Sequence, residues 1–390
     1  MRVLVVNAGS SSLKLSVLDP AGTVLAAHTV SRWSGDGAAD EVARFVRQTD
    51  RIDAVGHRVV HGGADFRGPA VLDPVVRERI AALTDLAPLH QPQALAGIDA
   101  VRAALPDAPA VACFDTAFHA DLPAAATTYA LPARWRQRWP LRRYGFHGLS
   151  HAHATRRAAE LLGRDLAGLR IVSCHLGAGA SLAAVAGGRS VDTTMGFTPL
   201  EGLVMATRSG SVDPGLLLWL LQRGGLTVSE VSEALEHESG LTGLAGSGDL
   251  RDVRRAAAAG DSGARLAVEV YQHRLRREIA AMAAAMNGLD VLVFTGGVGE
   301  HDPWTRAEAA GGLAFLGVRV APDRNEAVRS GADADISAAG AHAATVVVAA
   351  REDLEIAREV RATLTTGTAH GPVDEPGVGV GSAAQKPGQQ

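Results

Sequence analysis

The sequence predicts an α/β protein with two similar domains, and three observations support this fold class. The chain has 390 residues, which exceeds the size at which a single hydrophobic core usually stops growing. Short β-rich runs alternate with longer stretches of helical periodicity. A strand–turn–strand pattern near the N-terminus recurs at residues 171–193, and such a repeat indicates a duplicated fold.

The N-terminal region is predicted to form an antiparallel meander. Two apolar runs, Val3–Val6 and Leu13–Leu18, flank a polar turn. The turn Asp19–Gly22 then leads into a third run, Thr23–His28. Further along the chain, the apolar spacing over Val75–Leu86 is typical of a helix.

The second half of the chain repeats this layout around a Gly/Ala/Ser turn within Ile171–Thr193. Helical patterns occur at His151–Leu162, Pro214–Arg223, Val228–His237, Ser262–Asn287 and Pro303–Ala310. Buried strands are predicted from Val291 and over Ala343–Ala350, followed by a last helix at Glu352–Leu364. Residues 367–390 are rich in Gly, Pro and Gln and are predicted to form a disordered tail.

Composition and charge exclude several classes of function. The chain is 47% hydrophobic and 21% charged with a net charge of −4, and it has no basic block, so no nucleic-acid partner is expected. It has neither a secretion signal nor an apolar run of membrane-spanning length, so we expect a cytoplasmic protein without a membrane partner. Its two cysteines, Cys113 and Cys174, lie in apolar segments and are predicted to be reduced, buried thiols.

Three turns between strands are rich in glycine and small polar residues: Asn7–Ser12, Gly177–Ser181 and Thr295–Glu300. Such turns expose backbone N–H groups and short donors toward phosphate oxygens. None of them matches a P-loop or a dinucleotide-binding motif. Each alone fits an ordinary hairpin, but three together favour a phosphate site. Lys14 follows the first turn and, apart from Lys386, is the only lysine of the chain; its compact ammonium differs from the planar guanidinium of arginine.

Four further residues are candidates for chemistry. Strand alternation in "GHRVVHGG" places Arg58 and Val60 on one face and His57 and His61 on the other. An arginine beside a valine suits a carboxylate with an apolar tail, although a solvated edge-strand arginine fits equally. The other candidates are Asp115, which closes an apolar strand as a cap or a metal ligand; His147, between aromatic and glycine neighbours; and Arg208, in a Gly/Ser loop that could also be plain surface.

Nine segments, in order, closely resemble the acetate kinase family. They are "NAGSSSLK", "GHRVVHGG", "APLH", "FDTAFH", "YGFHGLSH", "CHLGAGAS", "DTTMGFTPLEGL", "TRSGSVDPG" and "FTGGVGE". The resemblance covers residues 1–365. It implies reversible phosphoryl transfer from ATP to acetate, giving acetyl phosphate and ADP, with Mg²⁺ (or Mn²⁺) as the metal.

The resemblance also implies an architecture. The fold would consist of two duplicated actin-like (ribonuclease H-like) domains with a nucleotide cleft between them. The first domain would comprise residues 1–118 plus 353–366, and the second would comprise residues 119–352. Members of this family are homodimers, so a homodimer is expected.

Site residues follow from the matching motifs. The catalytic residues would be Arg58, Asp115, His147 and Arg208. The nucleotide and its phosphates would contact Asn7, Ser10, Ser12, Lys14, His175, Gly177, Ala178, Gly179, Asp249, Leu250, Arg251, Gly296, Gly297, Val298, Gly299 and Glu300. Taken alone, the segment around Asp249 would be a helix N-cap. The carboxylate substrate would lie against Arg58, Val60, Leu89, Phe146 and Pro199. The metal would be held through water by Asn7, Asp115 and Glu352.

The chain departs from the family pattern at several positions. Ala178 replaces an asparagine, Ser211 an aspartate, His301 an asparagine, and Ala350–Arg351 a Thr-Asn pair. The loss of an amide at Ala178 bears on the rate of transfer. Two alternatives therefore stay open: a propionate or other short-chain carboxylate kinase, since one methylene is worth only about 1–3 kcal/mol in an apolar pocket, and a nucleotide-binding sensor without efficient transfer.

Overall fold

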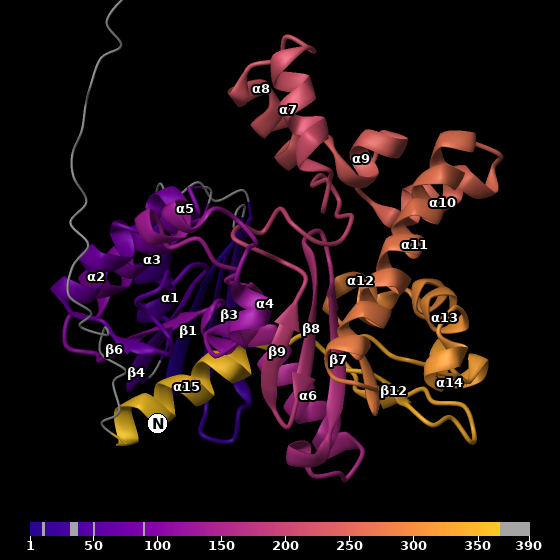
Figure 1. The fold of residues 1–390 in the computed structure, drawn as a ribbon. Coiled ribbons are helices and arrows are strands. Elements are labelled where there is room, and N and C mark those ends of the chain that lie inside the picture. Colours follow the sequence, from indigo (N-terminus) through magenta and orange to yellow (C-terminus); the bar gives the residue numbers. More distant parts are fainter. Residues whose placement is uncertain (10–11, 32–37, 50, 89, 367–390) are drawn as a thin grey trace, which may run out of the picture.

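A computed structural model describes residues 1–9, 12–31, 38–49, 51–88 and 90–366 (Figure 1). The predicted site residues Ser10 and Leu89 and the predicted tail 367–390 lie outside the described residues.

Two six-stranded mixed sheets organise the chain. The first contains β1 (Val3–Ala8), β2 (Ser12–Leu18), β3 (Val24–Ser31), β4 (Ala54–Val59), β5 (Ala70–Val71) and β6 (Ala110–Phe114) in the order β3-β2-β1-β4-β6-β5. The second contains β7 (Arg170–Leu176), β8 (Ala180–Ala186), β9 (Arg189–Thr193), β10 (Val291–Thr295), β11 (Ala334–Asp335) and β12 (Ala344–Val347) in the order β11-β12-β10-β7-β8-β9.

The two sheets have the same topology. In each, the first three strands form an antiparallel meander, and the first strand pairs in parallel with the fourth. The fourth strand in turn pairs in parallel with the sixth, and the short fifth strand adds to the sixth in the antiparallel direction. The predicted duplicated α/β fold is therefore confirmed.

Helices lie between and after the strands along the chain. In the first half they are α1 (Ala38–Arg47), α2 (Pro74–Ala81), α3 (Gln91–Ala104), α4 (Ala124–Thr127), α5 (Ala133–Arg138) and α6 (Gly148–Leu161). In the second half they are α7 (Pro214–Gln222), α8 (Val228–Glu233), α9 (Gly240–Ala245), α10 (Leu250–Ala258), α11 (Ser262–Ala285), α12 (Gly296–His301), α13 (Pro303–Gly311), α14 (Pro322–Glu326) and α15 (Glu352–Thr366). Short 3₁₀ turns are η1 (Thr84–Leu86), η2 (Ala117–His119), η3 (Leu166–Gly168) and η5 (Ala314–Leu316), and the π-turn η4 (Ala234–Glu238) follows α8.

Most predicted elements are present, with some boundary errors. The helix predicted over Val75–Leu86 is divided into α2 and η1, and the one predicted over Val228–His237 is divided into α8 and η4. The sequence interpretation missed α3. Its first turn contains Pro92, which occupies the second helical position, where a proline costs no intrahelical hydrogen bond. The two cysteines are free and buried, as predicted.

The C-terminal helix α15 returns from the second sheet to the first, as the yellow helix beneath β1 and β4 in Figure 1 shows. Ile356 and Val360 pack with Val5 and Val111 in one hydrophobic cluster. The helix is also tied to α6, because the fully buried carboxylate of Glu355 accepts from Arg156 of α6. Both ends of the described chain therefore belong to the same layer of helix and sheet.

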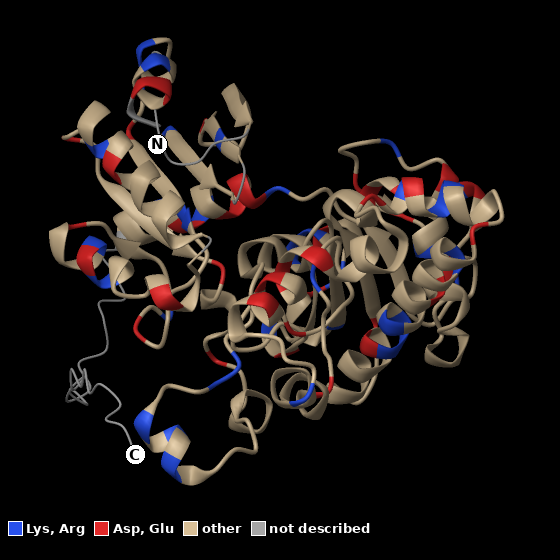
Figure 2. Ribbon diagram, turned by 90° about the horizontal axis from the view of Figure 1, so that it is seen from above, with Lys and Arg blue, Asp and Glu red and all other residues tan. Residues whose placement is uncertain are grey.

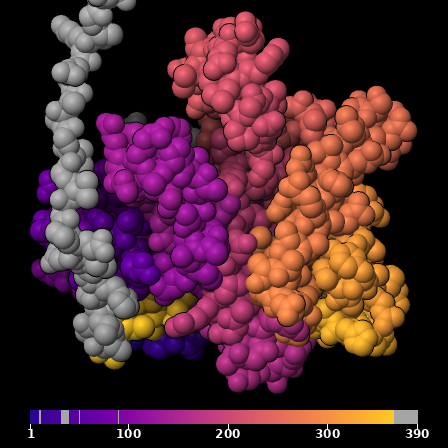
Figure 3. All heavy atoms as spheres, viewed as in Figure 1, coloured from indigo at the N-terminus to yellow at the C-terminus, as the bar shows by residue number. Residues whose placement is uncertain are grey.

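The helices α7 and α8 stand away from both sheets, as the rose-coloured projection at the top of Figures 1 and 3 shows. Although α7 reads PGLLLWLLQ, none of its residues is buried, and Leu218 and Trp219 are 55% and 57% exposed. Elsewhere acidic and basic residues are interspersed over the ribbon (Figure 2). No helix in the described part of the chain has the length and apolarity that a bilayer crossing requires.

The contact between β4 and α15 depends on Gly56. A Cβ atom at this position would lie 2.5 Å from Cγ2 of Ile356 and 2.7 Å from Cγ2 of Val360. We therefore expect Gly56→Ala to destabilise the protein by about 1–3 kcal/mol, the usual cost of overpacking a core, in chemical denaturation. Gly311→Ala is the matched control, because a Cβ there meets no atom within 4 Å. Equal stability of the two variants would contradict close packing of α15 on β4.

Candidate active site

Arg58 lies at the centre of a cluster of polar side chains where β1, β4 and β6 end. Its Nε and Nη2 donate to Oδ1 and Oδ2 of Asp115 at 3.0 and 2.6 Å, and its Nη1 donates to Oδ1 of Asn7 at 3.2 Å. Asn7 in turn donates from Nδ2 to Oε2 of Glu352 at 2.8 Å, and this oxygen lies 3.9 Å from Arg58 Nε. The structure thus brings together four residues that are distant in sequence.

The charges of this cluster stabilise one another. Burial alone would lower the pKa of Arg58, but the carboxylates of Asp115 and Glu352 raise it. Burial alone would raise the pKa of Glu352, but Arg58, His175 and Asn7 hold it below its usual value. Burial raises the pKa of Asp115, against the effect of Arg58. The two-pronged pairing of Asp115 with Arg58 is nevertheless the geometry of an ionised carboxylate.

His147 begins helix α6 in the left-handed conformation, with φ 56°. The next amide, of Gly148, donates to the carbonyl of Asp115 at 2.9 Å. A Cβ at Gly148 would overlap this carbonyl oxygen, so the close approach of α6 to the end of β6 requires glycine. The His147 ring stacks on His175, with centroids 4.3 Å apart, and its Nδ1 lies 2.9 Å from Oγ of Ser181.

Arg208 reaches the same region from the loop between β9 and α7. Its Nη1 donates to the carbonyl oxygen of Pro199 at 3.0 Å. Gly179, in the turn between β7 and β8, lies below it: a Cβ there would be 3.3 Å from Arg208 Nη2 and 3.6 Å from His147 Nε2. A guanidinium and an imidazole nitrogen therefore converge above a glycine with no side chain.

Two cavities open beside this point. The smaller, of about 380 Å³, is lined from both halves of the chain by Asp85, Leu86, Ala87, Pro88, His90, Ala178, Thr198, Pro199, Ala206, Thr207, Arg208, Glu236 and His237. The larger, of about 800 Å³, is lined by residues between Gly177 and Glu326. Ala178 and Ala206 line both cavities, so the turn after β7 lies between them.

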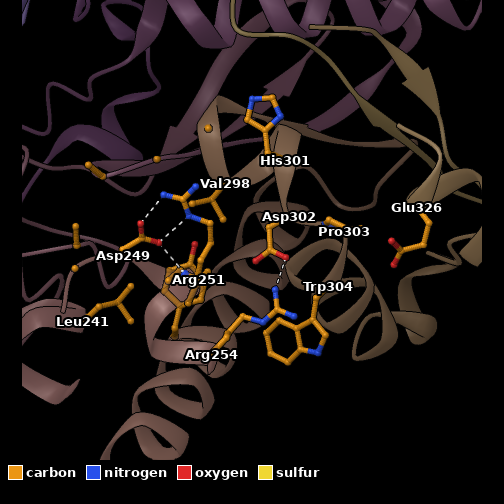
Figure 4. A pocket seen from close by; sticks show the side chains of 17 residues that line it. Leu241, Asp249, Arg251, Arg254, Val298, His301, Asp302, Pro303, Trp304 and Glu326 are labelled. Carbon is orange, nitrogen blue, oxygen red and sulfur yellow. Dashed lines mark hydrogen bonds and ion pairs between the residues drawn. The ribbon is translucent and has the colours of Figure 1, made fainter. Parts of the chain in front are cut away.

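The larger cavity gathers seven of the sixteen residues predicted to contact the nucleotide and its phosphates (Figure 4). Those lining it are Gly177, Ala178, Asp249, Leu250, Arg251, Gly297 and Val298. Asp249 also caps α10, since its side chain accepts from the amide of Arg251 at 2.9 Å. Asp249 is therefore the N-cap of α10, as the segment alone predicts, and it also lines the cavity.

The other predicted residues of this group do not line the large cavity. Gly296 has φ +78° and packs against the backbone of Leu176, and Gly299 packs against Phe294. Glu300 accepts from the amide of Ala350 at 2.9 Å. His175 hydrogen-bonds through Nδ1 to Ser150 at 2.7 Å. Gly296, Gly299, Glu300 and His175 thus make these contacts within the protein and are not part of the cavity lining.

Sequence reasoning missed several residues of the large cavity, among them Arg254, Tyr271 and Trp304. The Arg254 guanidinium lies 4.3 Å from the centroid of the Trp304 ring and donates to Asp302 at 2.6 Å, as Figure 4 shows. The Tyr271 hydroxyl is buried and has no hydrogen-bond partner among the described residues. Helical periodicity places Tyr271 and Trp304 in α11 and α13 but carries no signal that they face a cavity.

The side-chain directions predicted along β4 are only partly correct. Arg58 and Val60 do lie toward the site, Val60 in one hydrophobic cluster with Phe146. His61 was predicted on the opposite face with His57. Its ring instead packs against the ring of Phe146, with the two centroids 5.3 Å apart. The strand ends at Val59, so side-chain alternation no longer applies at His61, and this part of the prediction is wrong.

Ser12 and Lys14 lie on strand β2 beside the Arg58 cluster. Lys14 is the cross-strand partner of Asn7, and its charge helps to lower the pKa of Glu352. The carbonyl of Ser12 accepts from the amide of Gly9 at 2.8 Å and closes the first turn. The first hairpin therefore presents Asn7 and Lys14 on the same side as Glu352.

Residues 37–358 match the Acetokinase family. The chain belongs to the acetokinase family. It is 47% identical over 395 residues to the acetate kinase of Leifsonia xyli subsp. xyli, and the alignment covers 94% of this chain and 99% of that protein. It is 44% identical to the acetate kinase of Geobacillus kaustophilus, and that alignment covers 92% of this chain and 98% of that protein.

Solved structures agree with this assignment. The acetate kinase of Porphyromonas gingivalis superimposes on this acetokinase with a TM-score of 0.87 at 38% identity, covering 93% of this chain and 99% of that chain. A propionate kinase from Francisella tularensis gives a TM-score of 0.85 at 35% identity, with the same coverage. The family and the fold that the nine segments predicted are confirmed.

Proposed function

We propose that this chain catalyses reversible transfer of the γ-phosphoryl group of ATP to acetate, giving acetyl phosphate and ADP. The observation that carries the proposal is the convergence of Arg208 Nη2 and His147 Nε2 above Gly179. This point lies at the turn that separates the two cavities. A donor nucleotide in the larger cavity and a small acid in the smaller one would meet there.

Phosphoryl transfer requires in-line positioning and neutralisation of charge on the transferring group rather than a protein nucleophile. Arg208 and Arg58 would stabilise the charge on the equatorial and carboxylate oxygens, and His147 would donate a hydrogen bond from Nε2. These donors are fixed before the ligands arrive, because each is held by a protein partner: Pro199, Asp115 and Ser181 respectively. Such preorganisation is effective in a site sheltered from water.

A divalent metal, Mg²⁺ or alternatively Mn²⁺, fits the Arg58 cluster. Asp115 and Glu352 flank one guanidinium, so the cluster carries one negative charge in excess, and Asn7 adds an amide. Oxygen groups of this kind bind hard cations. Because Arg58 occupies both oxygens of Asp115, these residues would hold the metal through its water ligands. The metal would supply charge neutralisation on the phosphate oxygens.

The nucleotide would occupy the larger cavity. Its phosphates would approach the turn at Gly177 and Ala178 and the first hairpin with Asn7, Ser12 and Lys14. Its adenosine would lie between Asp249–Arg251 and Gly297–Val298, which line this cavity. Val60, Phe146 and Pro199 would contact the methyl group of the acid.

The domain boundaries that we propose are residues 1–118 plus 353–366 for the first domain and 119–352 for the second. The return of α15 to the first sheet supports the inclusion of the C-terminal helix in the first domain. We also propose that the protein works in the cytoplasm.

A second candidate acid is propionate. It is supported by the structural similarity to a propionate kinase, with a TM-score of 0.85. One methylene changes binding by only about 1–3 kcal/mol, and the smaller cavity of about 380 Å³ has room for it. We therefore expect activity with both acids, faster with acetate than with propionate.

A coupled assay of ADP release tests the function. We expect turnover with acetate, slower turnover with propionate and butyrate, and none without a divalent metal. Arg208→Ala should lower kcat by about 100-fold, the scale for loss of an electrostatic stabiliser. Arg189→Ala, at an exposed position of β9, is the control and should be unaffected. ATP binding without ADP release in the wild-type protein would favour the sensor alternative and overturn the proposal.

Ala178 provides a second test, since it lines both cavities and has no side-chain donor. An asparagine amide there could donate to a phosphoryl or carboxylate oxygen, a bond worth about 1.5–3 kcal/mol when the oxygen is charged. We expect Ala178→Asn to raise kcat/KM for acetate by about tenfold. Ala178→Leu has similar bulk without a donor and should give no gain; an equal gain would show that hydrogen bonding is not the cause.

The exposed apolar surface of α7 supports a homodimer in which this helix packs against a partner molecule. Leu216, Leu218 and Trp219 are 48%, 55% and 57% exposed, which is unusual for three neighbouring large apolar side chains. We expect a dimer in sedimentation analysis and a monomer after Leu218→Glu with Trp219→Glu. Phe315→Glu, at a 74% exposed position outside this helix, should leave the dimer intact. A dimer that survives the double substitution would contradict this interface.

A further inference from the structure

A chain of four side chains leads from the candidate active site into the protein interior. Oγ of Ser181 lies 2.9 Å from Nδ1 of His147 and 2.8 Å from Nε2 of His151. On its other side, Nδ1 of His151 lies 2.9 Å from Oγ of Ser173. Ser173, His151 and Ser181 are fully buried. The order from the interior outward is therefore Ser173, His151, Ser181 and His147.

The fold brings these residues together from three elements. His147 caps α6 and His151 lies one turn later on the same helix, so their side chains occupy one face. Ser173 on β7 and Ser181 on β8 both point toward this helix. Ser181 is the cross-strand partner of His175, two residues beyond Ser173 on β7, which places the two hydroxyls on one face of the sheet.

Two proton arrangements give the Ser181 hydroxyl proton an acceptor within this chain. Each neutral imidazole has one N–H and one bare nitrogen, and each hydroxyl has one proton. If His147 carries its proton on Nε2, then Ser181 must donate to its Nδ1. Ser181 can then only accept from His151 Nε2–H, and Ser173 must donate to His151 Nδ1. In the opposite arrangement every donor reverses, and His147 Nε2 becomes a bare acceptor.

We infer that Ser181, His151 and Ser173 are positioning residues that hold His147 as the neutral tautomer with its proton on Nε2. The inference rests on the proposed function. A phosphoryl oxygen is only an acceptor, so it selects the arrangement in which His147 Nε2 donates. In that arrangement both hydroxyl protons have an acceptor within the chain, whereas in the opposite one the Ser173 proton has none, so the interior serine and histidine stabilise the selected arrangement.

The surroundings favour a neutral imidazole. Burial lowers the pKa of His147 well below its usual value, and His175, Arg58, His151 and Arg208 lower it further. Burial likewise lowers the pKa of His151, together with His119 and His175. Protonation of His147 would also place a second N–H against the Ser181 hydroxyl, whose own proton would lose its acceptor on His147. Charging this ring therefore conflicts with both its neighbours and its hydrogen bonds.

His119 provides an independent comparison. Its Nε2 lies 3.1 Å from the carbonyl oxygen of Phe146, which only accepts, so Nε2 carries the proton and Nδ1 accepts from Ser190 at 2.7 Å. Ser190 and His119 are buried, but neither is hydrogen-bonded to the chain that ends at His147. Ser190→Ala thus removes the same kind of bond from the same kind of ring without breaking the chain.

The test is NMR of imidazole nitrogens in the wild-type protein and in Ser181→Ala, Ser181→Thr and Ser190→Ala, each free and with acetyl phosphate in the absence of ADP. We expect wild-type His147 to have a bare Nδ1 and a protonated Nε2. Ser181→Ala should mix the two tautomers and lower kcat about tenfold with KM for acetate unchanged. Ser181→Thr keeps the hydroxyl and should retain the wild-type tautomer and kcat. Ser190→Ala should change only the His119 signals.

Two results would overturn the inference. One is a wild-type His147 that is protonated on Nδ1 with acetyl phosphate bound. The other is an unchanged His147 tautomer in Ser181→Ala, because any loss of kcat would then be structural. If the wild-type protein shows the expected tautomer but no phosphoryl transfer, the proposed function fails while the tautomer assignment stands. Ser173→Ala, at the interior end, supplies a second variant if Ser181→Ala does not fold.

Discussion

The ion pair between Arg58 and Asp115 is the interaction on which the rest of the site depends. It joins the ends of two parallel strands, and through Asn7 it includes β1 and the first residue of α15, Glu352. Removing one partner of a buried pair leaves an uncompensated charge, which costs about 3–5 kcal/mol. The hydrogen bond from Asn7 to Glu352 therefore links α15 to the first sheet and also belongs to the site, so the packing of α15 and the assembly of the site are coupled.

Close approach of backbone segments completes the arrangement. Gly148 lets the start of α6 touch the carbonyl of Asp115, and Gly179 leaves room above the second hairpin for His147 and Arg208. The duplicated topology explains why these groups meet: each sheet contributes the turn between its first two strands, with Asn7 before one turn and Gly177–Gly179 within the other. The hairpin of the first sheet thus contributes a polar side chain, Asn7, and the equivalent hairpin of the second sheet contributes the backbone of Gly177–Gly179.

Sequence reasoning reached much of this but not all. The repeated meander is visible in the pattern of apolar runs, and the order of nine motifs predicted the family and the convergence of Arg58, Asp115 and His147. It could not show that β4 stops at Val59, which places His61 against Phe146, because strand ends depend on tertiary packing. Nor could it show that Tyr271 and Trp304 line the larger cavity, since apolar periodicity does not distinguish a core-facing aromatic ring from one that faces a cavity.

The site separates permanent charge from directional hydrogen bonding. Arg58 and Arg208 keep their charge at any physiological pH, and Arg58 is further held charged by its two carboxylates. His147 lies among these cations and in contact with His175, where a further positive charge would be repelled. A neutral imidazole avoids that repulsion and still offers one N–H of defined direction, provided that its other nitrogen has a donor. Ser181 lies at hydrogen-bond distance from that nitrogen. Its hydroxyl can therefore donate to Nδ1, which leaves the proton of the neutral imidazole on Nε2, where it can be donated to a ligand.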